Sequence, residues 1–206
     1  MKTRAPLLLG EPLPVELMNT IWADRDGVYD SLAEPGGTEA WLRAVATRVD
    51  LTAGDGPADL LAEDTEHLAR PLARLRDALR VLAAEVTGDP RPTASPTAEF
   101  DAAVATVNEA AGAVPRWSVL AWVAGASPTR LTRSGGPTAA AVISAIAEEA
   151  IAVFAHGDRL RLRACLAPGC VRYFVKDHPR REWCSPACGN RVRAARHYQR
   201  HRHSPV

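Results

Sequence analysis

The sequence lacks the segments that mark an exported or membrane-spanning protein. The early apolar run Leu7-Leu8-Leu9 is too short for the core of a signal peptide, and no small-residue cleavage site follows it. The richest apolar stretch, residues 139–155, contains Glu148-Glu149, so we expect a buried helix there rather than a membrane span. The absence of both signals predicts a cytoplasmic protein without membrane contact, in which thiols stay reduced.

Motifs of common enzyme classes are also missing. The pairs Gly36-Gly37 and Gly135-Gly136 lack the lysine and the spacing of a phosphate-binding loop, and we interpret them as turns. No nucleophile elbow and no carboxylate-pair motif occurs. Zinc-dependent nucleotide deaminases need a His-x-Glu sequence, which this chain does not contain. We therefore expect that the protein is not an enzyme.

Aromatic residues are few, and the charges are unevenly distributed. Aromatics make up 5% of the 206 residues, whereas Ala, Leu, Val and Arg dominate and favour helices. Residues 157–206 contain 12 Lys or Arg and three Asp or Glu, while residues 1–156 contain 13 and 21. A basic tail on an acidic body is typical of nucleic-acid binding, and a solvated charged tail has the same composition.

Hydrophobic periodicity and turn residues predict a mainly helical front part with short strands. Residues 7–22, which include two prolines, are expected to be extended and to lead into a helical turn. The next helix should begin with Thr38 as its N-cap, and a long helical segment from Pro57 to Gly88 should kink or divide at Pro71.

The second half of the front part predicts further elements of both kinds. They are, in chain order, a helix over 97–113, a hairpin of strands 117–123 and 129–132, and a core helix over 137–154. The first of these helices is expected to turn Phe100, Val104 and Val107 to one side. The sequence shows no internal repeat.

All four cysteines lie in one short window, in the pattern Cys-x4-Cys-x13-Cys-x3-Cys. Four thiolates satisfy a tetrahedral zinc ion without an open position, and two close pairs let two turns of the chain converge on one ion. In a reducing compartment this spacing favours one structural Zn²⁺ over two disulfides or four inert core cysteines. The predicted ligands are Cys165, Cys170, Cys184 and Cys188.

The residues around the cysteines predict a treble-clef-like arrangement. Residues 171–175 and 181–183 alternate like two short strands, joined by a turn over 176–180 that contains His178. His178 is expected to be an exposed turn residue, since four thiolates already close the zinc site. Ser185-Pro186 is typical of a helix start, with serine at the N-cap and proline at the first helical position. Cys188 would then lie in the first turn of a C-terminal helix.

The finger region resembles the CGNR zinc-finger family. The resemblance covers about the last forty residues and rests on Arg172-Tyr173-Phe174, Asp177, Arg181, Trp183-Cys184-Ser185 and, above all, Cys188-Gly189-Asn190-Arg191. The turn departs from the family pattern, because it is short and carries His178-Pro179 where small polar residues are usual. This difference affects the turn and leaves the metal ligands in place.

The front part is similar to the ABATE domain, which commonly precedes this finger. The similar pieces are Gly10-Glu11-Pro12-Leu13, Glu16-Leu17-Met18-Asn19-Thr20 and Leu75-Arg76-Asp77-Ala78-Leu79-Arg80, within residues 6–160. The resemblance implies a role as a stress-linked transcription regulator. Together the two similarities predict a helical domain over 1–158, with a sensing or dimerising role, and a small zinc finger over 159–206.

At about 100° per residue, the C-terminal helix has two faces. Ala187, Cys188, Arg191, Ala194, Ala195 and Tyr198 are expected to face the zinc and the hairpin, which gives Arg191 a structural role near the metal. The opposite face, with Asn190 toward the outer side, predicts a DNA-contacting surface completed by two arginines of the turn. Its members are Arg180, Arg181, Asn190, Arg193, Arg196, His197 and Arg200.

Two classes of function remain open from the sequence. The first is a transcription regulator that binds DNA through the finger, with homodimerisation plausible because a single finger binds weakly. The second is a zinc-thiolate redox switch or a protein-interaction module without DNA binding. In the front domain, Asn19, Arg76 and Arg80 are candidates for a pocket that binds an anionic effector, but the sequence favours the alternative that they are buried or surface salt-bridge partners in an acidic domain.

Overall fold

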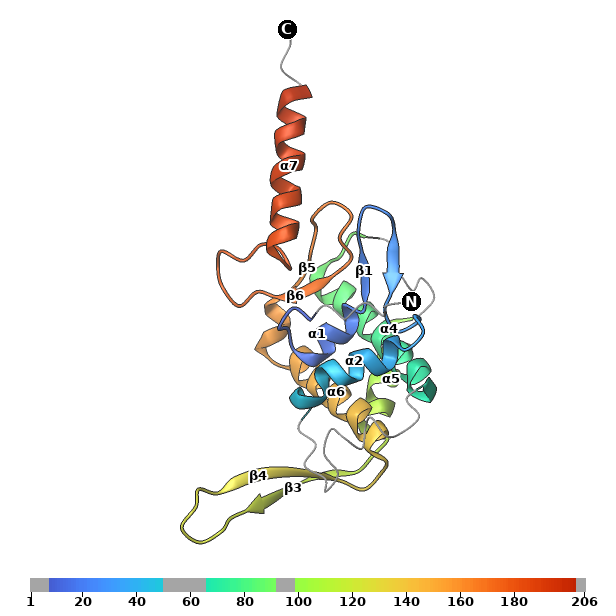
Figure 1. Ribbon diagram of the computed structural model, residues 1–206, viewed down its shortest axis with the longest axis vertical. Helices are drawn as coiled ribbons and strands as arrows, with labels where there is room; N and C mark the ends of the chain where they lie inside the picture. The colour runs from blue at the N-terminus through green and yellow to red at the C-terminus, as the bar shows by residue number, and fades with distance from the viewer. Residues whose placement is uncertain (1–7, 50–65, 92–98, 203–206) are drawn as a thin grey trace.

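The computed structural model describes residues 8–49, 66–91 and 99–202 (Figure 1). The α-helices are α1 (Leu13–Met18), α2 (Gly37–Val45), α4 (Ala69–Thr87), α5 (Phe100–Gly112), α6 (Thr138–Ala155) and α7 (Pro186–Arg202). Short 3-10 turns, η1 (Ala46–Arg48), η2 (Glu66–Leu68) and η3 (Gly157–Leu160), flank three of these helices.

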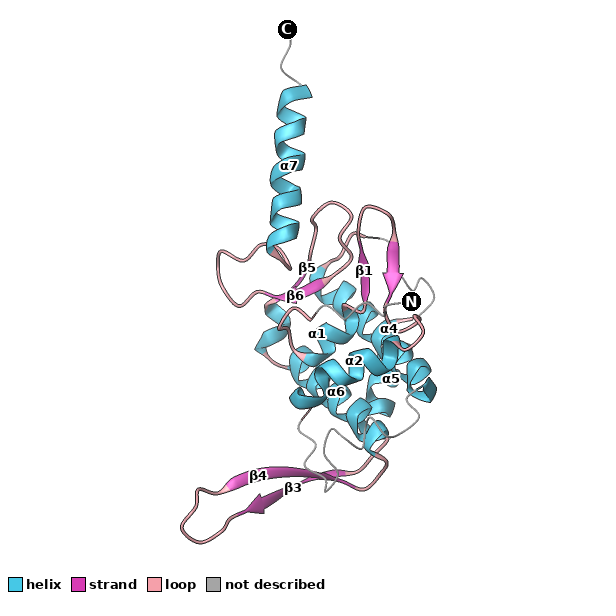
Figure 2. Cartoon of the chain, viewed as in Figure 1, coloured by secondary structure: helices cyan, strands magenta, loops and turns pink. Residues whose placement is uncertain are grey.

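The strands form two-stranded antiparallel sheets. The pairs are β1 (Ile21–Ala23) with β2 (Val28–Asp30), β3 (Arg116–Ala121) with β4 (Thr129–Ser134), and β5 (Leu162–Ala164) with β6 (Tyr173–Val175). The mainly helical fold with short strand pairs that the sequence predicts is therefore confirmed (Figure 2). The hairpin predicted after Pro115 is present, with Val119 opposite Leu131.

The core of the body lies between α1, α4, α5 and α6, which contact one another. Leu17, Leu75, Leu79 and Ile146 have lost essentially all exposure to water. By length and composition alone α6 is apolar enough to cross a membrane. In this fold α6 packs against the other three helices, so it serves as the central core helix that the sequence predicts.

One expectation near the start of the chain is confirmed in part, and one predicted helix start is wrong. The helical turn expected within residues 7–22 is α1, and Pro14 is tolerated there because it occupies a first-turn position where its missing N–H costs nothing. Thr38 is not an N-cap: α2 begins one residue earlier, after Gly36 in the left-handed conformation, and the Thr38 hydroxyl donates to Leu32 O. A side chain at Gly37 would lie 1.8 Å from a backbone oxygen, so only glycine fits there.

The division expected near Pro71 is present, whereas one expectation about α5 is wrong. The 3-10 turn η2 ends at Leu68 and α4 begins at Ala69, so Pro71 lies in the first turn of α4 and does not kink it. The part of the predicted helix between Pro57 and residue 65 lies outside the described residues. In α5, Ala103 and Val107 are buried, whereas Phe100 and Val104 are 50% and 37% exposed. The core row of α5 is thus shifted from the one predicted.

Two elements project from opposite ends of the body (Figure 1). The basic helix α7 extends from one end, and the β3–β4 hairpin extends from the other. The third hairpin, β5–β6, lies between the body and α7. Its residues Leu162, Tyr173 and Val175 belong to the same buried cluster as Leu17 and Leu79, so the finger shares part of the body's core.

Candidate metal centre and basic helix

The four cysteine sulfurs converge on one point at the base of α7. All four Sγ atoms lie within 4.8 Å of one another, with Cys170–Cys184 at 3.8 Å and Cys184–Cys188 at 3.5 Å. A tetrahedral zinc ion with Zn–S bonds of about 2.3 Å holds its sulfurs about 3.8 Å apart. A disulfide needs about 2.05 Å, and none of the four cysteines is in one. The donor set therefore fits a closed, structural zinc site.

The sulfurs perturb one another's ionisation strongly. Hydrogen bonding with Cys170 and Cys184 lowers the pKa of Cys165 to about 6. Hydrogen bonding with the other three sulfurs raises the pKa of Cys184 well above its ordinary value. Four buried sulfurs cannot all be thiolates without a cation, because their like charges repel, and a divalent ion removes that repulsion.

The first cysteine pair lies in the loop of the β5–β6 hairpin. Cys165 N–H donates to Arg172 O, and Cys170 N–H donates to Ala167 O. These two hydrogen bonds shape a tight turn that holds both sulfurs near the other cysteine pair. The partner of β6 is thus β5, and the predicted strand at 181–183 is wrong. Residues 181–183 form no strand, and Arg181 turns inward to the body, where it pairs with Glu11.

The second cysteine pair depends on the start of α7. The helix begins at Pro186, and Ser185 Oγ accepts a hydrogen bond from Cys188 N–H over 3.3 Å, as a serine N-cap does. Arg191, one turn later and half-buried, donates from Nη2 to Cys188 Sγ over 2.9 Å. The sulfur holds the pKa of the Arg191 guanidinium above its ordinary value. Arg191 therefore lies beside the metal and bonds a ligand sulfur rather than a carbonyl.

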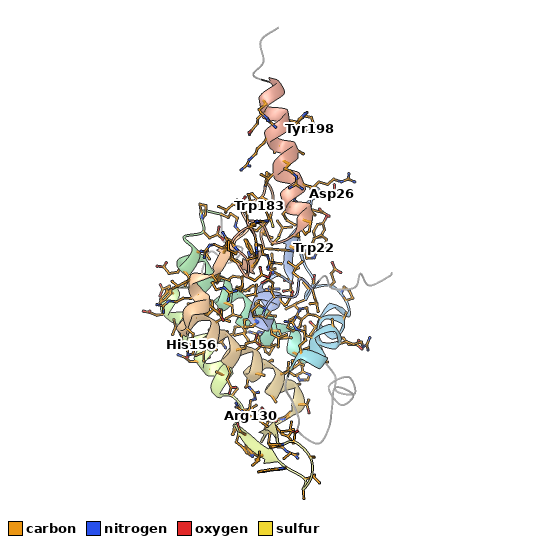
Figure 3. The ribbon with its side chains drawn as sticks, turned by 90° about the vertical axis from the view of Figure 1, so that its left-hand side faces the viewer. Trp22, Asp26, Arg130, His156, Trp183 and Tyr198 are labelled. Atoms are coloured by element: carbon orange, nitrogen blue, oxygen red, sulfur yellow. The ribbon has the colours of Figure 1, made fainter. Side chains whose placement is uncertain are left out.

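The outer part of α7 stands away from the rest of the protein. Apart from the zinc ligand Cys188, Val192 has the only buried side chain among the described side chains of α7. Of the predicted inward face, Cys188 is buried and Arg191 and Ala195 are half-buried, whereas Ala187, Ala194 and Tyr198 are exposed, so this face is predicted wrongly at three of its six positions. In Figure 3 Trp183 lies at the base of α7 and Tyr198 near its far end, where it is 71% exposed.

Most of the residues predicted to contact DNA are exposed on α7 or on the turn before it. Arg193, Arg196, His197 and Arg200 lie on the helix, and Arg193 donates to Asn190 Oδ1. Arg180 is exposed in the turn, where its N–H donates to His178 Nδ1. His178 is exposed there, as expected of a turn residue.

Arg181 does not belong to that surface, which corrects its predicted role. Its guanidinium stacks on the Phe174 ring at 5.1 Å and pairs with the buried carboxylate of Glu11. It also donates to Val175 O over 3.1 Å. Glu11 in turn accepts a hydrogen bond from Val175 N–H over 2.8 Å. These contacts join the first residues of the body to the finger, so Arg181 is a structural residue.

The three candidates for an effector pocket are also structural. Asn19 accepts from Tyr173 N–H and donates to Tyr173 O, both over 2.9 Å. Arg80 donates to the carbonyls of Met18 and Val171. Arg76 pairs with Asp30 and Asp77 at 2.6 and 3.0 Å. Their polar atoms are committed to the fold, and Asn19 and Arg80 connect the body to β6 and the residues before it.

Sequence reasoning missed a further anchor of the finger. Arg91 Nη1 donates to the carbonyls of Cys165, Cys170 and Arg172 over 3.0 to 3.3 Å. Asp89, 3% exposed, pairs with Arg91 at 2.6 Å and accepts from Tyr173 Oη over 2.7 Å. Asp89 and Arg91 follow α4 in a segment that reads only as a Pro-rich loop, and no local pattern points to their partners.

The fold and site define a class: a helical domain joined to a zinc-binding finger that carries a basic helix. Comparison with family models agrees with this description. Residues 11–157 match the ABATE family, described as "Putative stress-induced transcription regulator", and residues 161–201 match the CGNR zinc finger. The chain belongs to the ABATE family and ends in a CGNR zinc finger. Both families are of regulator or zinc-finger type rather than enzymes, and no curated protein matches the chain.

Proposed function

We propose that the protein is a cytoplasmic transcription regulator that binds DNA through α7. The observation that carries the proposal is a zinc-anchored helix that projects from the body and has arginines but no acidic residue. Helix α7 contains five arginines, and no Asp or Glu occurs after Glu182. Its 17 residues span about 25 Å, which suits insertion along a DNA groove.

The energetics of α7 support a polyanionic partner. Arg193, Arg196 and Arg200 are spaced three and four residues apart, and like charges at this spacing destabilise a helix by a few tenths of a kcal/mol per pair. The helix also buries little apolar surface that could offset this repulsion. Phosphates along a duplex would replace repulsion with attraction, and release of their counterions would drive binding.

We propose a division of labour along the chain. Residues 159–206 contact DNA, and residues 1–158 hold the finger and carry any sensing or dimerising function. In this proposal the contacting residues are Arg180, Asn190, Arg193, Arg196, His197 and Arg200. Burial of all four sulfurs gives oxidants little access to them, which favours a structural zinc ion over a redox switch.

The test is the salt dependence of duplex binding by the zinc-loaded, full-length protein. With about four phosphate contacts, log affinity plotted against log salt should have a slope near −3 to −4. Arg196→Ala should reduce that slope by about one, since it removes one contact. Arg25→Ala, which removes an arginine that is 92% exposed on the body, should leave it unchanged.

The opposite result would identify a different partner. A protein that ignores DNA at low salt, where electrostatic attraction is greatest, does not use α7 on nucleic acid. The basic helix would then be a surface that docks on an acidic protein. If Arg196→Ala and Arg25→Ala both bind DNA with the same slope of log affinity against log salt, the DNA-contacting surface lies elsewhere on the chain.

A further inference from the structure

The β3–β4 hairpin, which we call the arm (residues 116–134), exposes an unusual number of large apolar side chains to water. Four large apolar side chains lie open to water: Trp117 at 50%, Leu120 at 68%, Trp122 at 66% and Val123 at 75%. Large exposed apolar side chains gathered in one element mark an interaction site, whereas single ones are normal. The arm also projects away from the body and from α7 (Figure 1).

The arm has little support from its own fold. A two-stranded hairpin alone is marginally stable in water, and three strands or a packed face are usually needed. At its root Arg116 pairs with Glu148 of α6, and Gly135 N–H donates to Pro115 O. At its tip Trp122 Nε1 donates to Ala126 O. The face between root and tip lacks a covering element within the described residues.

The chemistry of the arm favours a protein partner with acidic and apolar groups. No Asp or Glu occurs between Glu109 and Glu148, and the arm carries three arginines. Trp and Arg are enriched at the centres of protein interfaces. Exposed aliphatic side chains such as Leu120 and Val123 gain from burial against protein, whereas a phosphate backbone offers them nothing.

The body of this same chain has a surface with the complementary properties. Apart from the arm, residues 1–156 contain 10 Lys or Arg and 21 Asp or Glu. The exposed side of α5 combines two apolar residues one turn apart, Phe100 and Val104, with the acidic residue Asp101, whereas Glu109 farther along the helix already pairs with Arg74 of α4. This α5 face therefore offers apolar contacts for the exposed apolar side chains of the arm and a carboxylate for one of its arginines.

We propose that the arm docks on the α5 face of a second copy of this chain, and that the contact is made twice in a two-fold dimer. Six-residue strands are about 20 Å long, and the 13 residues of α5 also span about 20 Å. Because α5 ends at Gly112 and β3 begins at Arg116, the arm of each copy starts at the C-terminal end of its own α5, about 18 Å along the helix from Phe100. A two-fold axis at this point lets the two arms cross reciprocally.

The area available is sufficient for a stable dimer. Because side chains alternate along a strand, Trp117 and Leu120 point to opposite faces of the arm, and the docked surface is taken as Leu120 with the tip residues Trp122 and Val123, roughly 350–400 Å² at their exposed fractions. Two arms and the surfaces that cover them then bury roughly 1,400–1,600 Å², within the range of a standard specific interface. Arm-to-arm pairing is less favourable because it would bring arginines of both copies together.

The first experiment measures self-association of the zinc-loaded, full-length protein by sedimentation equilibrium without DNA, so its outcome is independent of DNA binding. The wild-type protein should be a dimer at micromolar concentration. Replacement of residues 117–133 by Gly-Ser-Gly-Ser joins two positions that already face each other, Arg116 and Ser134. This armless variant should keep its zinc and helical circular dichroism and should associate at least about 100-fold more weakly.

Point variants test the two halves of the contact separately. Leu120→Asn on the arm should weaken dimerisation, whereas Leu160→Asn, equally exposed at 69% but on η3, should not. Val104→Ser on the α5 face should weaken it, and Val86→Ser, 41% exposed on α4, should not. If each control weakens association as much as its counterpart, the proposed surfaces are wrong.

A mixing experiment distinguishes arm-to-α5 docking from arm-to-arm pairing. The armless variant keeps its α5 face, and a Phe100→Ser, Val104→Ser double variant keeps its arm. Each alone should be monomeric, while their mixture should form a heterodimer through one intact contact. Absence of this heterodimer overturns the proposed docking site.

Three other results overturn the proposal. A wild-type protein that stays monomeric to about 100 μM has no such dimer. If the protein is monomeric and sediments with phosphatidylserine vesicles only when it has its arm, the arm binds membranes. An armless variant that associates normally but loses DNA affinity uses the arm on nucleic acid.

Discussion

Arg91 offers a sharp test of how the body holds the zinc finger. Its guanidinium bonds three carbonyls of the first cysteine turn and pairs with Asp89, and its side chain is 17% exposed. Burial raises the pKa of Asp89, but hydrogen bonds from Arg91 and Tyr173 outweigh that effect and hold it below its ordinary value. Arg91→Ala leaves this carboxylate charged and buried, with hydrogen bonds from the Tyr173 hydroxyl and from the backbone N–H of residue 91.

The expected cost follows from the burial of the pair. Removing one partner of a buried ion pair costs about 3–5 kcal/mol, and the two remaining hydrogen bonds to Asp89 place Arg91→Ala near 3 kcal/mol. For a domain of this size that lowers the melting temperature by about 6–12 °C. The Arg74–Glu109 pair is an exposed counterpart, with both side chains about two-thirds exposed, so Arg74→Ala should cost less than about 1 kcal/mol.

The assay is urea unfolding of the zinc-loaded variants, followed by competition with a chelator. Arg91→Ala should release zinc at lower chelator concentration than wild type, since two of its three carbonyl partners belong to zinc ligands. Arg91→Lys should recover only part of the loss, because one ammonium cannot bond three carbonyls and a carboxylate in the same geometry. A loss below 1 kcal/mol for Arg91→Ala, equal to that of Arg74→Ala, would refute this account.

Further tests concern the metal, the two sides of α7 and a buried carboxylate. Cys184→Ser should abolish stoichiometric zinc, and a variant that retains one zinc ion per chain by mass spectrometry would contradict the four-thiolate site. Arg191→Ala should lower the melting temperature more than Arg193→Ala, because it removes a bond to Cys188, and melting curves in the reverse order would contradict this. Burial raises the pKa of Glu149 above its ordinary value of 4.5. At pH values above the folded-state pKa the charged carboxylate therefore destabilises the folded protein, and this destabilisation fades as the pH falls toward 4.5. Glu149→Gln should therefore flatten the loss of stability as pH rises above 4.5 in urea titrations, and an unchanged slope would show that Glu149 is not its source.

The parts of the fold that could be predicted from sequence have local signals. The cysteine spacing determines the metal site, Ser185-Pro186 specifies a helix start within a few residues, and the apolar run of α6 requires burial. The strand partner of β6 was predicted wrongly because 181–183 alternates as β5 does. The two segments differ in contacts that are distant in sequence: Leu162 of β5 packs in the core of the body, whereas Arg181 pairs with Glu11 near the start of the chain.

The contacts that position the site have no such signal. Glu11, Asn19, Arg80 and Arg91 reach carbonyls, amides or side chains of the finger across more than 70 residues of sequence. Each is a single polar residue in an otherwise ordinary segment, so neither period nor spacing distinguishes it from a surface residue. The exposure of α7 could not be predicted from the sequence either, because helical periodicity defines the faces of a helix but not how far along the helix the body extends.

These contacts give the body a direct influence on α7. The finger has two buried clusters: Leu162, Tyr173 and Val175 pack with the body, and Phe174 and Val192 pack with the cysteines. Tyr173 and Phe174 are neighbours on β6 and point to opposite sides, so one strand links the two clusters. A change in the body that moves β6 must therefore either move the four cysteines as well or break the hydrogen bonds that Asn19 and Arg91 make with the finger. The zinc ion fixes α7 to the strand, the body fixes the strand, and the direction of the basic helix depends on both.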